Sequence, residues 1–109
     1  MSRISTHILD TAAGKPAAGV TVRLECLRDG AWEKVAENTT DADGRCNPLA
    51  GQVETGVHRL VFVTAPYFRD RARTSLYPEV VVTFTCDGEA HYHLPVLLSD
   101  NGYTTYRGS

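Results

Sequence analysis

The sequence predicts an all-β protein folded as a β-sandwich, and three observations support this prediction. Apolar and polar residues alternate along most of the chain, which indicates strands that bury one face. Turn signals rich in Gly, Asp and Asn recur roughly every 8–12 residues, a spacing typical of sandwiches. The length of 109 residues fits a single domain, residues 1–109, and leaves no room for a second hydrophobic core. A barrel made of the same seven or eight strands is the structural alternative.

Four strands are expected before residue 65, and each is bounded by turn residues: Arg3–Asp10, Val20–Leu27, Trp32–Thr39 and Gly56–Thr64. In the first strand, Ile4, Thr6 and Ile8 share one face, and Ser5, His7 and Leu9 share the other. Asp29-Gly30 predicts a hairpin turn between the second and third strands. The fourth strand carries apolar residues on both faces, which predicts burial on both sides.

The C-terminal part of the chain is expected to contain one helix and three more strands. Ala65–Thr74 holds several charged residues without a strand pattern, so we assign it to a short helix. Val80–Cys86 and Ala90–Leu98 are strands on either side of the turn Asp87-Gly88. Tyr103–Tyr106 is the last strand.

Composition and charge exclude several classes of protein. Eleven Lys and Arg residues against thirteen Asp and Glu residues give a net charge of −2, so we expect no nucleic-acid partner and no membrane partner. No apolar run approaches the roughly 20 residues of a membrane span, and the N-terminus lacks the apolar stretch of a signal peptide. Three cysteines without Cys-x-x-Cys spacing indicate reduced thiols in a cytoplasmic protein.

Two histidines on one strand face are the first candidates for chemistry. In Ala90–Leu98 the residues Tyr92, Leu94, Val96 and Leu98 form a core face, which leaves His91, His93, Pro95 and Leu97 on the opposite face. His7 lies on the non-core face of the first strand in the same way. Ordinary solvated side chains are the alternative interpretation of these histidines. A face that mixes His, Pro and Leu favours contact with another subunit or a ligand, whereas His58 has no such context and receives no role.

Arg45 and a possible metal site complete the candidates. His91-x-His93 with His7 as a third ligand could begin a zinc site, but no Cys or carboxylate has ligand spacing, so we expect neither a metal nor another cofactor. Arg45 follows the turn Asp41–Gly44 at the start of a strand. It could form a surface salt bridge of little energetic value. Beside a histidine, it could instead bind a developing oxyanion and lower the imidazole pKa by charge repulsion.

Three segments together resemble the transthyretin-like protein family. The run Ile4–Asp10, followed by Gly14–Ala17, resembles the family's opening, and His91–Ser99 resembles its penultimate strand. The final Tyr106-Arg107-Gly108-Ser109 resembles the signature that separates the enzyme branch, the 5-hydroxyisourate hydrolases, from the carrier transthyretin. The resemblance covers essentially the whole chain. It departs from the family at the turn Ser99–Gly102, where we expect only a local change of the loop.

The resemblance implies a fold, an assembly and an activity. The fold is a two-sheet, eight-stranded transthyretin-like (prealbumin-like) sandwich with one short helix. The assembly is a homotetramer, a dimer of dimers, with active sites in the channel between the dimers. The activity is hydrolysis of 5-hydroxyisourate to 2-oxo-4-hydroxy-4-carboxy-5-ureidoimidazoline, a step of urate degradation in purine metabolism, on a small-molecule substrate and without a cofactor.

Carried over position by position, the resemblance implies catalytic roles for His7, Arg45, His93 and Ser109, and substrate contacts for His7, Arg45 and Tyr106. The two histidines are expected to orient water and move protons, while Arg45 stabilises charge in the transition state. Which histidine is the base stays open. A small-molecule carrier that uses the same channel is the rival function, and a β-sandwich adhesion module is a third interpretation. The polar groups at His7, Arg45 and His93 favour the enzyme over the carrier, and an adhesion module would usually have a secretion signal, which we do not find.

Overall fold

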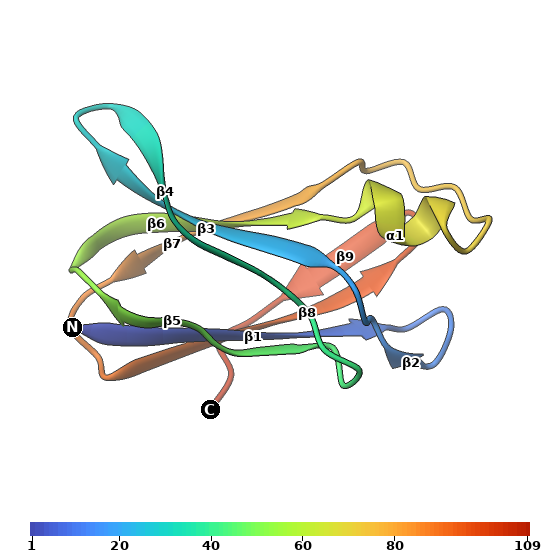
Figure 1. The fold of residues 1–109 in the computed structure, drawn as a ribbon, viewed down its shortest axis with the longest axis horizontal. Helices are drawn as coiled ribbons and strands as arrows, with labels where there is room; N and C mark the ends of the chain where they lie inside the picture. The colour runs from blue at the N-terminus through green and yellow to red at the C-terminus, as the bar shows by residue number, and fades with distance from the viewer.

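The computed structural model describes residues 1–109 as nine strands and one short helix (Figure 1). In chain order the elements are β1 (Ser2–Asp10), β2 (Lys15–Pro16), β3 (Thr21–Arg28), β4 (Ala31–Thr39), β5 (Arg45–Val53), β6 (Gly56–Val63), α1 (Ala65–Arg69), β7 (Val80–Cys86), β8 (His91–Ser99) and β9 (Gly102–Thr105). The all-β architecture with one helix is therefore confirmed. The helix lies at the end of the sandwich opposite the N-terminus (Figure 1).

The strands form two sheets that face each other. One sheet has the order β2-β1-β8-β9, with β5 also paired to β1, and the other has the order β4-β3-β6-β7. All pairs are antiparallel except β1 with β8, which run parallel. The buried side chains between the sheets form one core, which includes Ile4, Ile8, Val22, Leu24, Leu60, Phe62, Phe68, Val80, Val96 and Leu98. The fold is therefore a sandwich and not a barrel, because no strand of one sheet pairs with a strand of the other.

Two predicted elements differ from the structure for local reasons. The helix spans only Ala65–Arg69, because Asp70 caps it and Ala72 takes a left-handed backbone conformation with φ 56°. The prediction of a helix to Thr74 was therefore wrong over its second half. The burial of both faces of Gly56–Thr64 was also wrong: His58, Leu60 and Phe62 are buried, but on the other face Val61 alone is buried.

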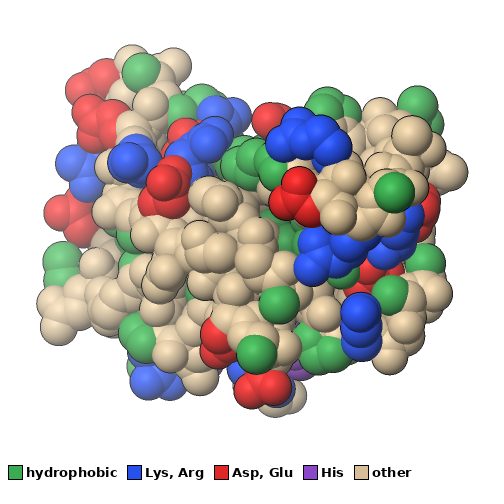
Figure 2. Space-filling model, turned by 45° about the vertical axis from the view of Figure 1, so that its right-hand side comes forward, with side chains coloured by type: hydrophobic (Ala, Val, Ile, Leu, Met, Phe, Trp, Pro, Cys, Tyr) green, Lys and Arg blue, Asp and Glu red, His purple; other side chains and the backbone are tan.

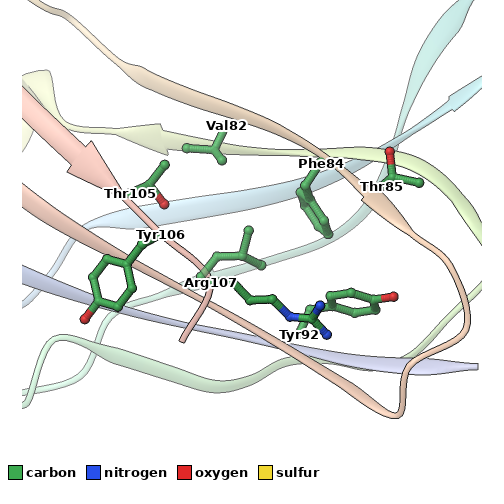
Figure 3. A pocket seen from close by; sticks show the side chains of 8 residues that line it. Val82, Phe84, Thr85, Tyr92, Thr105, Tyr106 and Arg107 are labelled. Atoms are coloured by element: carbon green, nitrogen blue, oxygen red, sulfur yellow. The ribbon is translucent and has the colours of Figure 1, made fainter. Parts of the chain in front are cut away.

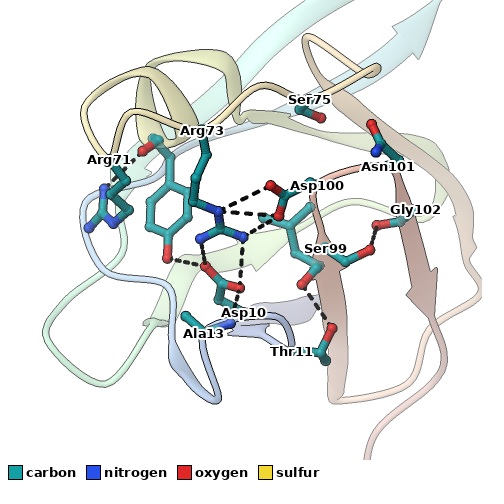
Figure 4. Close-up of polar contacts among 12 residues, drawn as sticks. Asp10, Thr11, Ala13, Arg71, Arg73, Ser75, Ser99, Asp100, Asn101 and Gly102 are labelled. Carbon is teal, nitrogen blue, oxygen red and sulfur yellow. Dashed lines mark hydrogen bonds and ion pairs between the residues drawn. The ribbon is translucent and has the colours of Figure 1, made fainter.

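A cluster of charged and polar groups fixes the C-terminal end of β1 to the loop after α1 (Figure 4). The buried Asp10 carboxylate accepts hydrogen bonds from Arg73 Nη1 at 2.6 Å and from the Tyr67 hydroxyl at 2.7 Å. Arg73 also pairs with Asp100 in the turn between β8 and β9. Burial alone raises the pKa of Asp10, but these hydrogen bonds outweigh it and hold that pKa well below its usual range. The cluster thereby joins β1, α1 and the β8–β9 turn.

The molecular surface mixes both signs of charge. Figure 2 shows acidic and basic side chains interspersed over one face, as the net charge of −2 suggests. The single helix has neither the length nor the apolar run of a membrane-spanning segment.

Candidate active site on the outer face of the first sheet

The histidines His7, His91 and His93 lie on the face of the β1–β8 pair that points away from the core. In the parallel register Arg3 pairs with His91, Ser5 with His93 and His7 with Pro95. Paired residues of neighbouring strands point to the same side of a sheet. The alternate residues of both strands, such as Ile4 and Tyr92, are buried in the core. The period-two pattern of the sequence thus places these histidines correctly.

Arg45 reaches the same face from the other side of β1. In the β1–β5 ladder Arg45 is the partner of His7, so β1 lies between Arg45 and the strand of His93. The preceding turn holds Arg45 in place, because Asp41 Oδ1 accepts hydrogen bonds from the backbone N–H groups of Asp43 at 2.9 Å and Arg45 at 3.0 Å. Gly44 completes the turn with φ 75°, a conformation that favours glycine.

His7 is oriented by the turn that positions Arg45. Its Nε2 lies 2.9 Å from the backbone carbonyl oxygen of Asp43. A carbonyl oxygen can only accept, so Nε2 carries the proton of this hydrogen bond. In the neutral ring, Nδ1 is then the nitrogen with a free lone pair.

Ser5 is a residue of this site to which the sequence analysis assigned no role. Its hydroxyl lies 2.7 Å from His91 Nε2 and 2.8 Å from His93 Nδ1, and the residue is 1% exposed. Arg3 Nη2 in turn lies 3.4 Å from His91 Nδ1. The sequence feature that could have identified Ser5 is its position on the same outer strand face as His7. The register of β1 against β8, which brings Ser5 beside His93, could not be derived from the sequence.

Electrostatics keep His93 neutral. Burial lowers the pKa of His93, and charge repulsion from its neighbours His91, Arg45 and His7 lowers it further. The expected depression of an imidazole pKa by Arg45 is therefore present, although burial is the larger cause. At neutral pH the His93 ring carries one proton, on one of its two nitrogens.

The C-terminal tail packs beside His93. The Gly108 N–H donates to the His93 carbonyl oxygen at 2.8 Å, in an isolated antiparallel bridge. A Cβ atom at Gly108 would lie 2.5 Å from His93 Cδ2, so only glycine fits against the ring. The sequence analysis gave Gly108 no role because steric contact leaves no periodic signal. Ser109 follows directly and is exposed at the edge of the site.

Tyr106 stands apart from the other candidates. It is 54% exposed, and its hydroxyl forms no hydrogen bond with His7, Arg45 or His93. Counting back from the bridge at Gly108 places Tyr106 on the same outer face as His93, since side chains alternate along an extended chain. The structure therefore brings His7, Arg45 and His93 to one face, with Gly108 packed on His93 and Tyr106 at the periphery.

A mostly apolar hollow lies elsewhere (Figure 3). This cavity, of about 190 Å³, lies between β7, β8 and the tail, and is lined by Val82, Phe84, Thr85, Tyr92, Leu94, Thr105, Tyr106 and Arg107. The Arg107 guanidinium lies 4.9 Å from the centre of the Tyr92 ring. Because Tyr92 and Leu94 are on the core face of β8, the cavity opens on the side opposite to His91 and His93. It is not the site of the candidate chemistry.

The remaining titratable groups offer no alternative nucleophile. All three cysteines are free and buried, and burial raises the pKa of Cys46 and of Cys86 to about 11, so these two thiols stay protonated. His58 is buried in the core, where its Nδ1 lies 3.1 Å from the Gly56 carbonyl oxygen. No group of three or more His, Cys, Asp or Glu side chains is arranged to hold a metal ion.

Comparisons with known proteins point to one family. The model of the HIUase/Transthyretin family matches residues 4–108. The chain is 42% identical to 5-hydroxyisourate hydrolase of Mus musculus, over 99% of this chain and 96% of that protein. It is 44% identical to 5-hydroxyisourate hydrolase of Caulobacter vibrioides over the full length of both chains.

Solved structures of both branches are similar to this fold. The structure of Klebsiella pneumoniae 5-hydroxyisourate hydrolase matches with a TM-score of 0.88 and 38% identity, over 100% of this chain and 94% of that chain. Sea bream transthyretin in complex with thyroxine matches with a TM-score of 0.92 and 32% identity, over 97% of this chain and 94% of that chain. Fold similarity alone therefore does not separate an enzyme from a carrier, whereas sequence identity and the polar groups of the outer face favour the enzyme.

Proposed function

The chain belongs to the HIUase/Transthyretin family, and from this premise we propose that it hydrolyses 5-hydroxyisourate with His7, Arg45 and His93 at the centre of its active site. The observation that carries the proposal is the grouping of these three side chains on one face of β1 and its two neighbours. An apolar hormone channel would gain nothing from two imidazoles and a guanidinium, because burying unpaired polar groups is unfavourable.

The reaction opens a ring at an amide-type C–N bond and yields 2-oxo-4-hydroxy-4-carboxy-5-ureidoimidazoline. It needs a base for the attacking water, charge stabilisation on the carbonyl oxygen and a proton for the leaving nitrogen. The two imidazoles supply proton transfer and hydrogen bonding, and Arg45 holds the substrate oxygens. Water attacks directly, since all three free thiols are buried and burial keeps those of Cys46 and Cys86 protonated. This places the enzyme in urate degradation.

Two residues of the tail contribute at the border of the site. Ser109 follows the glycine that packs on His93, so its hydroxyl is within reach of the same pocket and assists catalysis. Tyr106, on the same face, positions the substrate ring by hydrogen bonding and stacking. Both roles need the pocket to be closed from the opposite side.

A second copy of the chain provides that closure. β7 and β9 are edge strands of the two sheets, and their outward backbone groups are unpaired. Of the eight large hydrophobic residues that are exposed, five lie on or beside these strands, namely Leu76, Tyr77, Val81, Tyr103 and Tyr106. Edge pairing there would form a dimer, and two dimers meeting through their histidine faces would form a cytoplasmic homotetramer with the active sites between them.

Turnover of freshly generated 5-hydroxyisourate, followed by ultraviolet absorbance, tests the proposal. Arg45→Ala and His93→Ala should each lower kcat/KM by about 10²-fold or more, because each removes a group that stabilises the transition state. Size-exclusion chromatography with light scattering should show that the assembly is unchanged. Wild-type efficiency in both variants would refute the assignment, and thyroxine-like binding without turnover would favour the carrier.

A further inference from the structure

We propose that Ser5 and His91 are positioning residues that give the two active-site histidines, His7 and His93, different roles in catalysis. They hold His93 as a neutral hydrogen-bond donor through Nε2, which leaves His7 as the only base. The inference rests on the proposed function and deepens it, because the resemblance to the family left the base unassigned. It follows from the direction of a chain of hydrogen bonds that runs from Arg3 to His93.

Arg3 determines which atom donates in each hydrogen bond of this series. A guanidinium has only donors, so Arg3 Nη2, at 3.4 Å from His91 Nδ1, can only donate to that nitrogen. His91 Nδ1 must then be unprotonated, and the proton of the neutral His91 ring lies on Nε2. A proton on Nδ1 would instead point at the positive charge of Arg3.

Ser5 accepts a hydrogen bond from His91 and donates one to His93. His91 Nε2–H donates to Ser5 Oγ across 2.7 Å, so the hydroxyl acts as acceptor on that side. Its own proton is then available for His93 Nδ1 at 2.8 Å. Because Ser5 is only 1% exposed, water does not compete for either interaction. His93 Nδ1 therefore accepts, and the single proton of neutral His93 lies on Nε2.

His7 has the complementary arrangement. Its Nε2–H donates to the Asp43 carbonyl oxygen at 2.9 Å, so the free lone pair lies on Nδ1. A neutral ring with a free Nδ1 can accept a proton, while a ring with Nε2–H facing the substrate cannot. The two histidines thus differ in function because their hydrogen-bond partners leave different ring nitrogens free.

The division gives a balanced reaction. His7 Nδ1 takes one proton from water as the water oxygen bonds to the carbonyl carbon. His93 Nε2–H and Arg45 donate hydrogen bonds to the oxygen that becomes negative, and neither loses its proton. When the C–N bond breaks, the His7 imidazolium gives its proton to the leaving nitrogen and returns to the neutral base. His93 never needs to become an imidazolate.

Nitrogen NMR of protein labelled with ¹⁵N-histidine tests the hydrogen-bond direction without any substrate. Protonated and unprotonated ring nitrogens have well-separated shifts, and a His93→Gln variant assigns the His93 signals. At a pH above the histidine pKa values, His93 should be protonated on Nε2 and not on Nδ1. A proton on His93 Nδ1 in the wild type would overturn the inference while leaving the proposed function intact.

Two variants of equal size test the same point from His91. The amide of His91→Gln turns its oxygen toward Arg3 and its N–H toward Ser5, so His93 Nδ1 should stay unprotonated. The carboxylate of His91→Glu can only accept, so Ser5 must donate to it and His93 Nδ1 should become protonated. The same His93 protonation state in both variants would contradict the relay.

Kinetics then separate positioning from general structural support. Ser5→Ala removes the hydroxyl and should lower kcat about tenfold, the equivalent of one hydrogen bond, with KM changed less than about twofold. Ser5→Thr keeps the hydroxyl and should recover most of the loss. If Ser5→Ala has wild-type kcat, or if Ser5→Thr is no better than Ser5→Ala at equal thermal stability, then Ser5 does not position His93.

Discussion

At the scale of single residues, the site contains contacts so close that one extra atom would collide with a neighbouring side chain. Gly108 is the clearest case, since a Cβ there would lie 2.5 Å from His93 Cδ2 and 3.2 Å from Pro95 Cγ. Gly108→Ala should displace the His93 ring and lower kcat/KM by about 10- to 100-fold, because catalysis is sensitive to displacements of about 1 Å. The measurement is the ultraviolet assay together with a thermal melt.

The chain offers a matched control for this substitution. Gly102 lies at the start of β9, and the atom nearest to a Cβ there is Ser99 Oγ at 3.5 Å, an ordinary contact. Gly102→Ala should retain activity. Equal activity in the two alanine variants would show that the tail does not hold His93 in position.

Residue-scale comparison also shows what the sequence could reveal about the site. His7 and His93 were predicted on outward faces because strand periodicity depends only on neighbouring residues. Arg45 was found through the turn before it. The roles of Ser5 and Gly108 come from contacts between segments about 88 and 15 positions apart, which need the register of β1, β8 and the tail.

At the scale of elements, the Asp10–Arg73 ion pair fastens the loop after α1 to the end of β1. Asp10 has no exposed side-chain surface, so losing its partner leaves a buried, unpaired carboxylate. Arg73→Met should lower the free energy of unfolding by about 3 kcal/mol at about pH 7, as measured by urea denaturation. Arg28→Met, which breaks the exposed pair with Glu54 at 3.1 Å, is the control and should change the stability far less, because water screens an exposed pair.

The pH dependence of that loss identifies its cause. The pKa of Asp10 lies below its usual value in the folded protein, so the ion pair contributes its full stability above the unfolded-state pKa, about 4. That contribution disappears as the pH falls through the folded-state pKa. The stability gap between wild type and Arg73→Met should therefore shrink in acid. A gap that is constant down to about pH 2 would indicate lost packing instead of a lost charge pair.

Elements also differ in how well the sequence predicts them. β1, β3 and β8 alternate regularly and were predicted within a few residues. β5 was recognised only at its first residue, because Asn47, Pro48 and Gly51 interrupt its alternation and its pairing with β1 shifts register. The helix was predicted too long, since nothing in the composition of Arg69–Thr74 shows that Arg73 leaves the helix to reach Asp10.

At the scale of the whole molecule, the position of the site is the reason for proposing an assembly of several copies. The histidine face of the first sheet lies outside the core, and the large apolar hollow lies on the other side of β8. A water-accessible face cannot exclude solvent or hold a substrate on two sides. In the proposed assembly, the exposed apolar residues beside β7 and β9 would form the first contact between copies, and the outer face of β1 and β8 would form the second.

Charge placed on the β7 edge tests this assembly. Thr83 is exposed in the middle of β7, and in a symmetric edge-to-edge pair the same strand of each copy meets its counterpart. Thr83→Lys should therefore bring like charges together, weaken the pairing and lower the molar mass measured by light scattering from about four times the 11.9 kDa of one chain. If another copy closes the active site as proposed, turnover should fall in parallel with the loss of mass and recover at high protein concentration. Thr39→Lys, on the opposite edge strand β4, is the control and should leave both mass and turnover unchanged. A fully active wild-type protein of 11.9 kDa in solution would show that a single chain builds the complete site.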